Sequence, residues 1–225
     1  MRESEAARYV SAICLELEHR REYLRGATVS TVYFGGGTPS RLTPDQIGQV
    51  IDCIRVVFGL DDLIELTVEC NPDDITPGYV TALRDYGVNR ISMGVQTFND
   101  DLLRFLGRRH TAAQAVEAVN ICLKAGIENI SIDLMYGLPG QTPDIQQNDL
   151  DFLTSLGENR IPFTIIYTKC DKLSQTAFNA QLERNKALLS EQWEPLPDML
   201  SSSSQNGKGK EEILDYIEDL IKSLK

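Results

Sequence analysis

The chain has 225 residues, of which 42% are hydrophobic and 24% are charged, a composition typical of a globular protein with a substantial core. Its net charge of −11 argues against a broad basic surface, so we expect no nucleic acid partner. No apolar run approaches the ~20 residues of a membrane span, and the N-terminus "MRESEAARYV" carries no apolar signal core. We therefore expect a cytoplasmic protein without a membrane anchor.

Predicted helices and strands alternate along the chain. In order, we expect a helix at about 4–25, a strand at 30–34, a helix at 44–58, a strand at 63–69, a helix at 76–87, a strand at 89–95, helices at 99–106 and 111–125, a strand at 128–137, a helix at 144–156, a strand at 162–168, a helix at 175–190, a strand at 198–202 and a helix at 210–224. Thr43, Pro44 and Gln46 form a capping-box signal. The alternation predicts an α/β fold with a parallel sheet of about six strands and crossover helices.

The basic residues change type along the chain. Residues 1–150 contain 12 Arg and 1 Lys, whereas residues 151–225 contain 2 Arg and 7 Lys, and glycine falls from 13 to 3. The shift predicts two segments of different origin, 1–150 and 151–225, packed as one continuous α/β unit. We expect their junction in the helix at 144–156, whose apolar face is formed by Leu150, Phe152, Leu153 and Leu156. The strand "FTIIYT" should then pair beside "SIDLM".

The five cysteines are scattered along the chain at Cys14, Cys53, Cys70, Cys122 and Cys170. No two of them form a CxxC motif, so their spacing predicts no local metal clamp and no metal site. In a cytoplasmic chain we expect all of them to be reduced and to act as small hydrophobic residues.

Unusual residues gather where the predicted strands end. They are Gly35, Gly36, Gly37 and Thr38 after the first strand, Glu69, Asn71 and Pro72 after the second, Gln96 after the third, Arg108 and Arg109 in "GRRHT", and Asp133 in the fourth. In parallel α/β folds ligands bind at these strand ends. Exposed backbone groups with one carboxylate suit an ammonium, an Arg suits a carboxylate, and Gln with Asp suits ribose hydroxyls. Taken singly, each residue has a plainer interpretation, and a triple glycine alone is more often a tight turn.

Five motifs in order, "VYFGGGTPSRL", "VECNPDD", "GVNRISMGVQTFND", "LLRFLGRRHT" and "ISIDLMYGLPGQT", resemble the radical SAM enzymes of the oxygen-independent coproporphyrinogen III oxidase family, especially its heme-chaperone-like HemW branch. The resemblance covers residues 1–150 and implies a partial TIM-barrel-like fold that binds S-adenosylmethionine (SAM). It implies that Gly35, Gly36, Gly37, Thr38 and Glu69 face the amino group of SAM. It places Arg108 at the carboxylate, and Gln96 with Asp133 at the ribose.

The chain departs from this family at its cofactor. The family holds a [4Fe–4S] cluster on a CxxxCxxC motif before the "FGGGTP" strand, and the present sequence contains no such motif. We therefore expect no radical chemistry, no catalytic residue and weak or lost SAM binding in this chain. We also expect the family's first strand to be absent, which predicts an open sheet edge and a dimer through it.

A second motif follows residue 150. The strand in "IPFTIIYTKCDKL" ends in Thr168, Lys169 and Asp171, the Thr-Lys-x-Asp pattern with which GTPases read guanine. Residues 151–225, including Trp193, resemble the C-terminal half of EngB-type ribosome-biogenesis GTP-binding proteins, a P-loop-GTPase-like βαβα portion with Ser203 and Ser204 in the last guanine loop. No GxxxxGK[ST] phosphate loop occurs, so we expect at most weak GTP or GDP binding and no hydrolysis.

Three functions are compatible with these motifs. The first is a radical SAM, coproporphyrinogen-oxidase-like fragment joined to a partial GTPase, catalytically inactive in both parts. The second is a SAM- or porphyrin-binding protein without radical chemistry. The third is a guanine-nucleotide-binding, EngB-like protein whose N-terminal half has been replaced. The extent of the resemblance favours the first.

Overall fold

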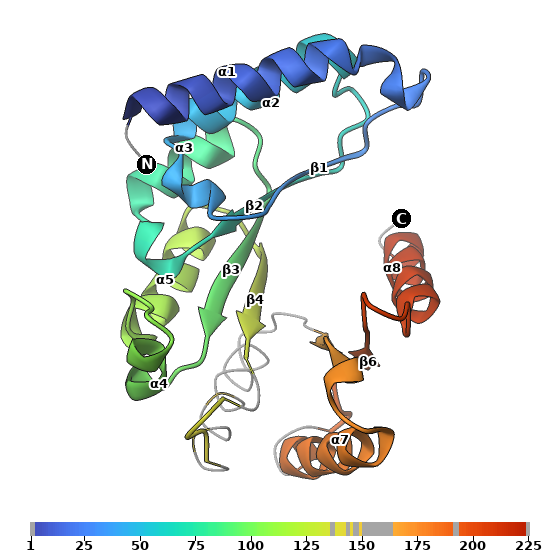
Figure 1. Ribbon diagram of the computed structural model, residues 1–225. Coiled ribbons are helices and arrows are strands. Elements are labelled where there is room, and N and C mark those ends of the chain that lie inside the picture. The colour runs from blue at the N-terminus through green and yellow to red at the C-terminus, as the bar shows by residue number, and fades with distance from the viewer. Residues whose placement is uncertain are drawn as a thin grey trace. The chain divides into compact units, whose positions relative to one another are not determined.

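A computed structural model describes residues 3–135, 138–142, 145, 149, 164–190 and 194–223 (Figure 1). The chain divides into two compact units, Met1–Ile145 and Gln146–Lys225. In the described residues the first unit contains a four-stranded sheet and the second a two-stranded sheet.

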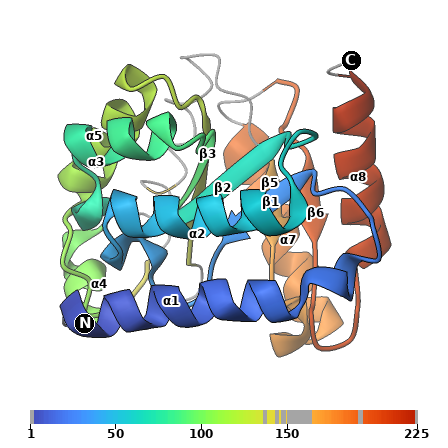
Figure 2. The same ribbon diagram turned by 90° about the horizontal axis from the view of Figure 1, so that it is seen from above.

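The sheet of the first unit is parallel throughout and has the spatial order β1-β2-β3-β4. Its strands are β1 (Thr31–Phe34), β2 (Glu65–Cys70), β3 (Arg90–Gln96) and β4 (Asn129–Leu134). The helices are α1 (Glu3–His19), α2 (Pro44–Phe58), α3 (Pro77–Asp85), α4 (Asp100–Phe105) and α5 (Ala112–Lys124). Of these, α1 packs on α2, α2 on α3 and α3 on α5, so the helices form a row beside the sheet (Figures 1 and 2).

The core of this unit lies between the two central strands and the helices. Leu66 and Val68 of β2 and Ile91 and Met93 of β3 are fully buried, as expected for the inner strands of a parallel sheet. They share the interior with a set of apolar helix residues, namely Ile47, Ile51, Val80, Leu83 and Ala118. The strand ends, where the polar motifs lie, are therefore held on a rigid support.

Local signals set several helix boundaries. The predicted capping box is confirmed, because the Thr43 hydroxyl accepts a hydrogen bond from Gln46 N and the Gln46 side chain accepts one from Thr43 N. The predicted helix at 4–25 is shorter than expected: α1 ends at His19, a 3₁₀ turn (Arg21–Leu24) follows, and Arg25 adopts a left-handed conformation at φ 50°. None of the helices in the described ranges combines the length and apolar composition needed to span a membrane.

Two cysteines differ from the sequence-based prediction. Cys14 in α1 and Cys53 in α2 form a disulfide, with their Cα atoms 5.7 Å apart, so the expectation that all cysteines are reduced is wrong for this pair. The packing of α1 on α2 brings them together, which their separation of 39 residues did not indicate. Cys70, Cys122 and Cys170 are free and buried, as expected. Burial raises the pKa of Cys122 to about 12, so its thiol is neutral.

The second unit is a small parallel βαβ arrangement. Its elements are β5 (Ile165–Tyr167), the 3₁₀ turn Cys170–Lys172, α7 (Gln175–Ser190), β6 (Met199–Ser201) and α8 (Lys210–Ser223). Ile165 pairs with Met199 and Tyr167 with Ser201. The predicted pairing of "FTIIYT" beside "SIDLM" in one sheet is wrong, because β5 pairs with β6, the strand to which α7 connects it.

Part of the predicted junction lies outside the described residues. This holds for most of the helix expected at 144–156, including its apolar residues Leu150, Phe152, Leu153 and Leu156, and for Trp193. The open edge expected in the first unit is the free side of β1, which pairs only with β2 in the described part of the chain. A dimer through this edge stays a prediction.

Replacing Gly48 with alanine tests the contact between α2 and α3. A Cβ at this buried glycine would overlap the ring of Tyr86, whose hydroxyl donates to Asp45 Oδ1 at 2.9 Å. Gly78, in the first turn of α3, has open space at the same position and is the matched control. Because both variants gain helix propensity, we expect Gly48→Ala to be less stable than Gly78→Ala by about 1–3 kcal/mol in urea unfolding. Equal stabilities would contradict this packing.

Candidate functional site

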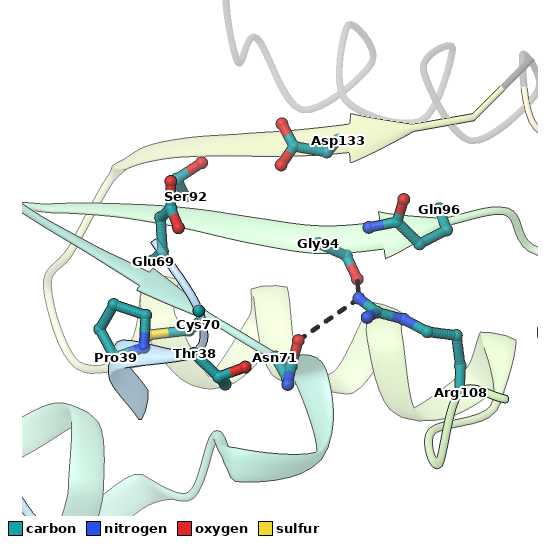
Figure 3. A pocket seen from close by; sticks show the side chains of 11 residues that line it. Thr38, Pro39, Glu69, Cys70, Asn71, Ser92, Gly94, Gln96, Arg108 and Asp133 are labelled. Atoms are coloured by element: carbon teal, nitrogen blue, oxygen red, sulfur yellow. Dashed lines mark hydrogen bonds between the residues drawn. The ribbon is translucent and has the colours of Figure 1, made fainter. Parts of the chain in front are cut away.

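A pocket of about 180 Å³ opens at the carboxyl ends of the strands of the first unit. It is lined by Gly37, Thr38, Pro39, Glu69, Cys70, Asn71, Ser92, Gly94, Gln96, Arg108 and Asp133 (Figure 3). These residues come from all three strands β2–β4 and from the loops after β1, β2 and α4. The structure thus brings together six of the eight residues predicted for the first site, and Gly35 and Gly36 lie in the same loop as Gly37.

The three consecutive glycines allow both a tight turn and a close approach of the backbone to Tyr33 and Glu69. Gly36 and Gly37 have φ values of 80° and 66°, which glycine adopts with little strain. At Gly35 a side chain would overlap the Tyr33 ring and meet Glu69 Oε1 at 3.0 Å. Glu69 fixes the loop, because its carboxylate accepts hydrogen bonds from Tyr33 Oη at 2.8 Å and from Gly36 N at 3.1 Å. Desolvation and this carboxylate raise the pKa of Tyr33, so its hydroxyl remains a donor.

Arg108 is held against β3 and is not a solvated helix charge. Its Nη2 atom donates to the Gly94 carbonyl and to Asn71 Oδ1, the latter at 3.3 Å (Figure 3). A Cβ at Gly94 would lie 2.8 Å from the same Nη2 atom and 2.9 Å from Gln96 Nε2, so a larger residue would force both side chains to shift. Within the described residues, Arg108 Nε is buried and has no hydrogen-bond partner. Buried donors without a partner are uncommon in folded proteins.

Gln96 and Asp133 lie on neighbouring strands at the far side of the pocket (Figure 3). Gln96 has a φ of 74° at an irregularity in the β3–β4 pairing, and its carbonyl accepts a hydrogen bond from Met135 N at 2.7 Å. Partial desolvation and the Glu69 carboxylate raise the pKa of Asp133, and Arg108 partly opposes this. The two side chains therefore present amide and carboxylate groups to the same space.

Two further predicted strand-end residues, Pro72 and Arg109, do not line the pocket. Pro72 begins the 3₁₀ turn after β2, and Arg109 forms ion pairs with Asp73 and Asp74 of that turn. Sequence reasoning missed Ser92 and Gly94, which line the pocket from β3. Their signal was present in "RISMGVQ", where a buried polar residue and a glycine interrupt an otherwise apolar strand.

The second predicted site has a definite geometry in its own unit. Ser203, which is 2% exposed, donates from its hydroxyl to Asp171 Oδ1 and accepts from Gln205 N at 3.2 Å. This hydrogen bond lowers the pKa of Asp171, so the carboxylate stays ionised. Lys169 adopts a left-handed conformation at φ 57° in the turn after β5, while Thr168 and Ser204 are exposed. The structure thus brings together the turn with Asp171 and the loop with Ser203.

Among the described residues, no group of three or more His, Cys, Asp or Glu side chains could hold a metal ion. The side chains of the described part of the chain therefore do not fit an iron–sulfur cluster.

Comparisons with known proteins agree on the first unit. The heme chaperone HemW of Lactococcus lactis is 44% identical over 138 residues, which are 61% of this chain and 36% of that protein. HemW of Bacillus subtilis is 43% identical over 129 residues, 57% of this chain and 34% of that protein. The structure of coproporphyrinogen III oxidase (HemN) from Escherichia coli, described as a radical SAM enzyme, superimposes with a TM-score of 0.63 at 34% identity and covers 69% of this chain and 36% of that one. The chain thus spans about a third of the length of these relatives.

A family model confirms that the first unit resembles radical SAM proteins. The model of the radical SAM superfamily matches residues 15–153, which include every residue of the pocket. The match ends close to the predicted boundary near residue 150, and the GTPase likeness of the remaining segment stays a prediction. With its parallel strands, its glycine loop and this match over more than half of its length, the chain belongs to the radical SAM superfamily.

Proposed function

We propose that the first unit binds SAM in its strand-end pocket, as the corresponding part of a HemW-like protein. The proposal rests on the charge of the pocket and on the hydrogen-bonding groups that line it. Two carboxylates, Glu69 and Asp133, and one guanidinium, Arg108, line it, which gives a charge of about −1 by their usual ionisation. SAM carries a sulfonium, an ammonium and a carboxylate, so its net charge of about +1 is complementary.

Each end of SAM has a matching group in the pocket. The glycine loop lets an ammonium approach backbone atoms beside Glu69, which remains an acceptor. The buried Nε of Arg108 has no partner in the described residues and suits the carboxylate of the methionyl group. Gln96 and Asp133 suit the ribose hydroxyls. These pairings support the roles expected from the family resemblance.

Bound SAM supplies an activated sulfonium whose carbon–sulfur bonds are open to cleavage. The residues of this chain bind and orient it. The buried residues of β2 and β3 beside the pocket exclude water, which strengthens the hydrogen bonds of Arg108 and Glu69. The radical SAM superfamily also uses a [4Fe–4S] cluster, for which the described side chains offer no ligands. The expectation that this chain alone performs no radical chemistry stays a prediction, and absorbance near 400 nm after anaerobic reconstitution with iron and sulfide would contradict it.

The relatives named heme chaperones are about three times as long as the part matched here. We therefore propose SAM binding as the function of this unit and porphyrin binding as a separate proposal. A titration with porphyrin in the presence and absence of SAM tests the binding of porphyrin.

Replacing Arg108 tests the carboxylate partner. Loss of a charged hydrogen bond costs about 1.5–3 kcal/mol, so we expect Arg108→Ala to weaken SAM binding about 10- to 100-fold in isothermal titration calorimetry. Arg108→Lys should not restore the affinity, because lysine lacks the planar fork of donors. Arg104→Ala is the matched control, since Arg104 is exposed on α4 and pairs with Asp101. Unchanged affinity in Arg108→Ala would overturn the assignment.

Replacing Asp133 with asparagine should improve stability while weakening SAM binding. The folded-state pKa of Asp133 is raised, so the ionised carboxylate opposes folding at neutral pH, and this effect vanishes as the pH falls below both the folded and the unfolded pKa. Because Asp133 is exposed and solvent screens part of this effect, we expect the melting temperature of Asp133→Asn to rise by no more than about 1 °C at pH 7 and to equal that of the wild type near pH 3. A lower melting temperature at pH 7 would contradict the desolvation of this carboxylate.

A second candidate function is guanine recognition in the second unit. We propose that Asp171 accepts hydrogen bonds from a guanine base, with Lys169 beside it, because the Ser203 hydrogen bond keeps this carboxylate ionised and oriented. The described residues of this unit supply no phosphate loop, so the base carries the affinity and GTP hydrolysis is not expected.

The guanine site is tested by comparing GDP with ADP. In NMR titrations we expect weak binding of GDP, a shift of the Asp171 and Ser203 signals, and no response to ADP. Asp171→Ala should reduce the GDP affinity about 10-fold or more, whereas Asp215→Ala, a change on α8, should leave it unchanged. Equal responses to GDP and ADP would refute base recognition.

A further inference from the structure

A polar cluster outside the pocket joins the three loops that form one of its walls. It centres on Asp74, at the end of the 3₁₀ turn Pro72–Asp74, whose side chain is 12% exposed. Asp74 Oδ2 accepts from the Ser40 hydroxyl at 2.7 Å, and Oδ1 accepts from Arg41 at 3.5 Å and from Arg109 at 3.4 Å. One carboxylate thereby connects the loop after β1, the loop after β2 and the loop after α4.

A chain of hydrogen bonds leads from this carboxylate into the pocket. The buried Ser40 hydroxyl donates its hydrogen to Asp74, so its lone pair is available to accept Asn71 N–H at 3.1 Å. The side chain of Asn71 in turn accepts from Arg108 Nη2 at 3.3 Å. Hydrogen bonds thus connect Asp74 through Ser40 and Asn71 to the Arg108 guanidinium, which the Gly94 carbonyl also binds.

The same cluster keeps a second guanidinium out of the pocket. Arg109 follows Arg108 directly, and it is bound to Asp73 and Asp74, whose side chains are 16% and 12% exposed. The Arg109 side chain itself is 56% exposed, so solvent partly screens both pairs. The pocket receives one positive charge from the pair of arginines.

We propose that Asp74 is a positioning residue for the amino-acid end of the ligand. It acts on Arg108 through Ser40 and Asn71, and it makes none of the contacts that the structure shows at Gln96 or Asp133, where the ribose is expected. This inference rests on the proposed binding of SAM. It predicts that loss of Asp74 weakens the interaction with the methionyl group and leaves the adenosine end unchanged.

Two ligands separate these ends. SAM and 5′-methylthioadenosine share the adenosine, but the second lacks the amino and carboxylate groups. In Asp74→Asn, an amide replaces the carboxylate beside two guanidiniums, so the loops lose the negative charge and one of the two acceptor oxygens that join them. By calorimetry we expect the Kd for SAM to rise about 5- to 20-fold, less than in Arg108→Ala because Asp74 acts only through Ser40 and Asn71, and the Kd for 5′-methylthioadenosine to change less than about twofold.

Neighbouring variants serve as controls. Asp73→Asn removes a partner of Arg109 but has no contact with Ser40 in the described structure, so it should change the ratio of the two Kd values much less than Asp74→Asn. Ser40→Ala interrupts the same chain and should change the ratio in the same direction. In the double variant Asp74→Asn/Ser40→Ala, the two changes in the Kd ratio should not add, because both interrupt the same chain of hydrogen bonds.

The outcomes distinguish this inference from the proposed function. A wild-type chain that binds neither ligand overturns SAM binding and this inference with it. If the wild type binds SAM but the Kd ratio is unchanged in Asp74→Asn, the inference alone is overturned. A parallel loss of affinity for both ligands with a lower melting temperature also overturns it, because a purely structural role would produce that result. If Asp74→Asn does not fold, the Kd ratio in Ser40→Ala decides.

Discussion

The hydrogen bonds accepted by Glu69 are the constraint on which the first unit's site depends. This carboxylate lies one residue before the end of β2 and binds both Tyr33 and the backbone of Gly36, so it attaches the loop after one strand to the end of the next. A flexible run of three glycines has a high entropy when unfolded, and it keeps one conformation only if such contacts offset that loss. The parallel register of β1 and β2 places these groups at the same edge of the sheet.

Much of this arrangement could be predicted from local patterns. The capping residues Thr43 and Gln46 marked a helix start, and the polar residues after successive strands had to meet because parallel strands end at one edge. The roles within the site were harder to predict. That Arg108 lies in the pocket and Arg109 outside it follows from Gly94, Asn71 and the acidic pair at 73–74, which are distant in sequence and come together only in the fold.

The errors of the sequence-based interpretation concern long-range pairing. Strand propensity identified β5, but propensity does not say which strand it joins, and β6 lies across a single connecting helix. The cysteines show the same limit, since two thiols on different helices pair only when those helices pack with a particular rotation. Burial of Cys70 and Cys122, by contrast, follows from their places within apolar segments.

The disulfide between Cys14 and Cys53 has a topological consequence for the glycine loop. It closes a covalent ring over a separation of 39 residues, and this ring contains β1 and the whole of Gly35–Thr38. A ring of this size restricts the unfolded chain by about 4 kcal/mol in the chain-entropy description. A proteolytic cut anywhere inside the ring would leave both fragments linked through sulfur, so the nicked protein would migrate as one chain until a reductant separated it.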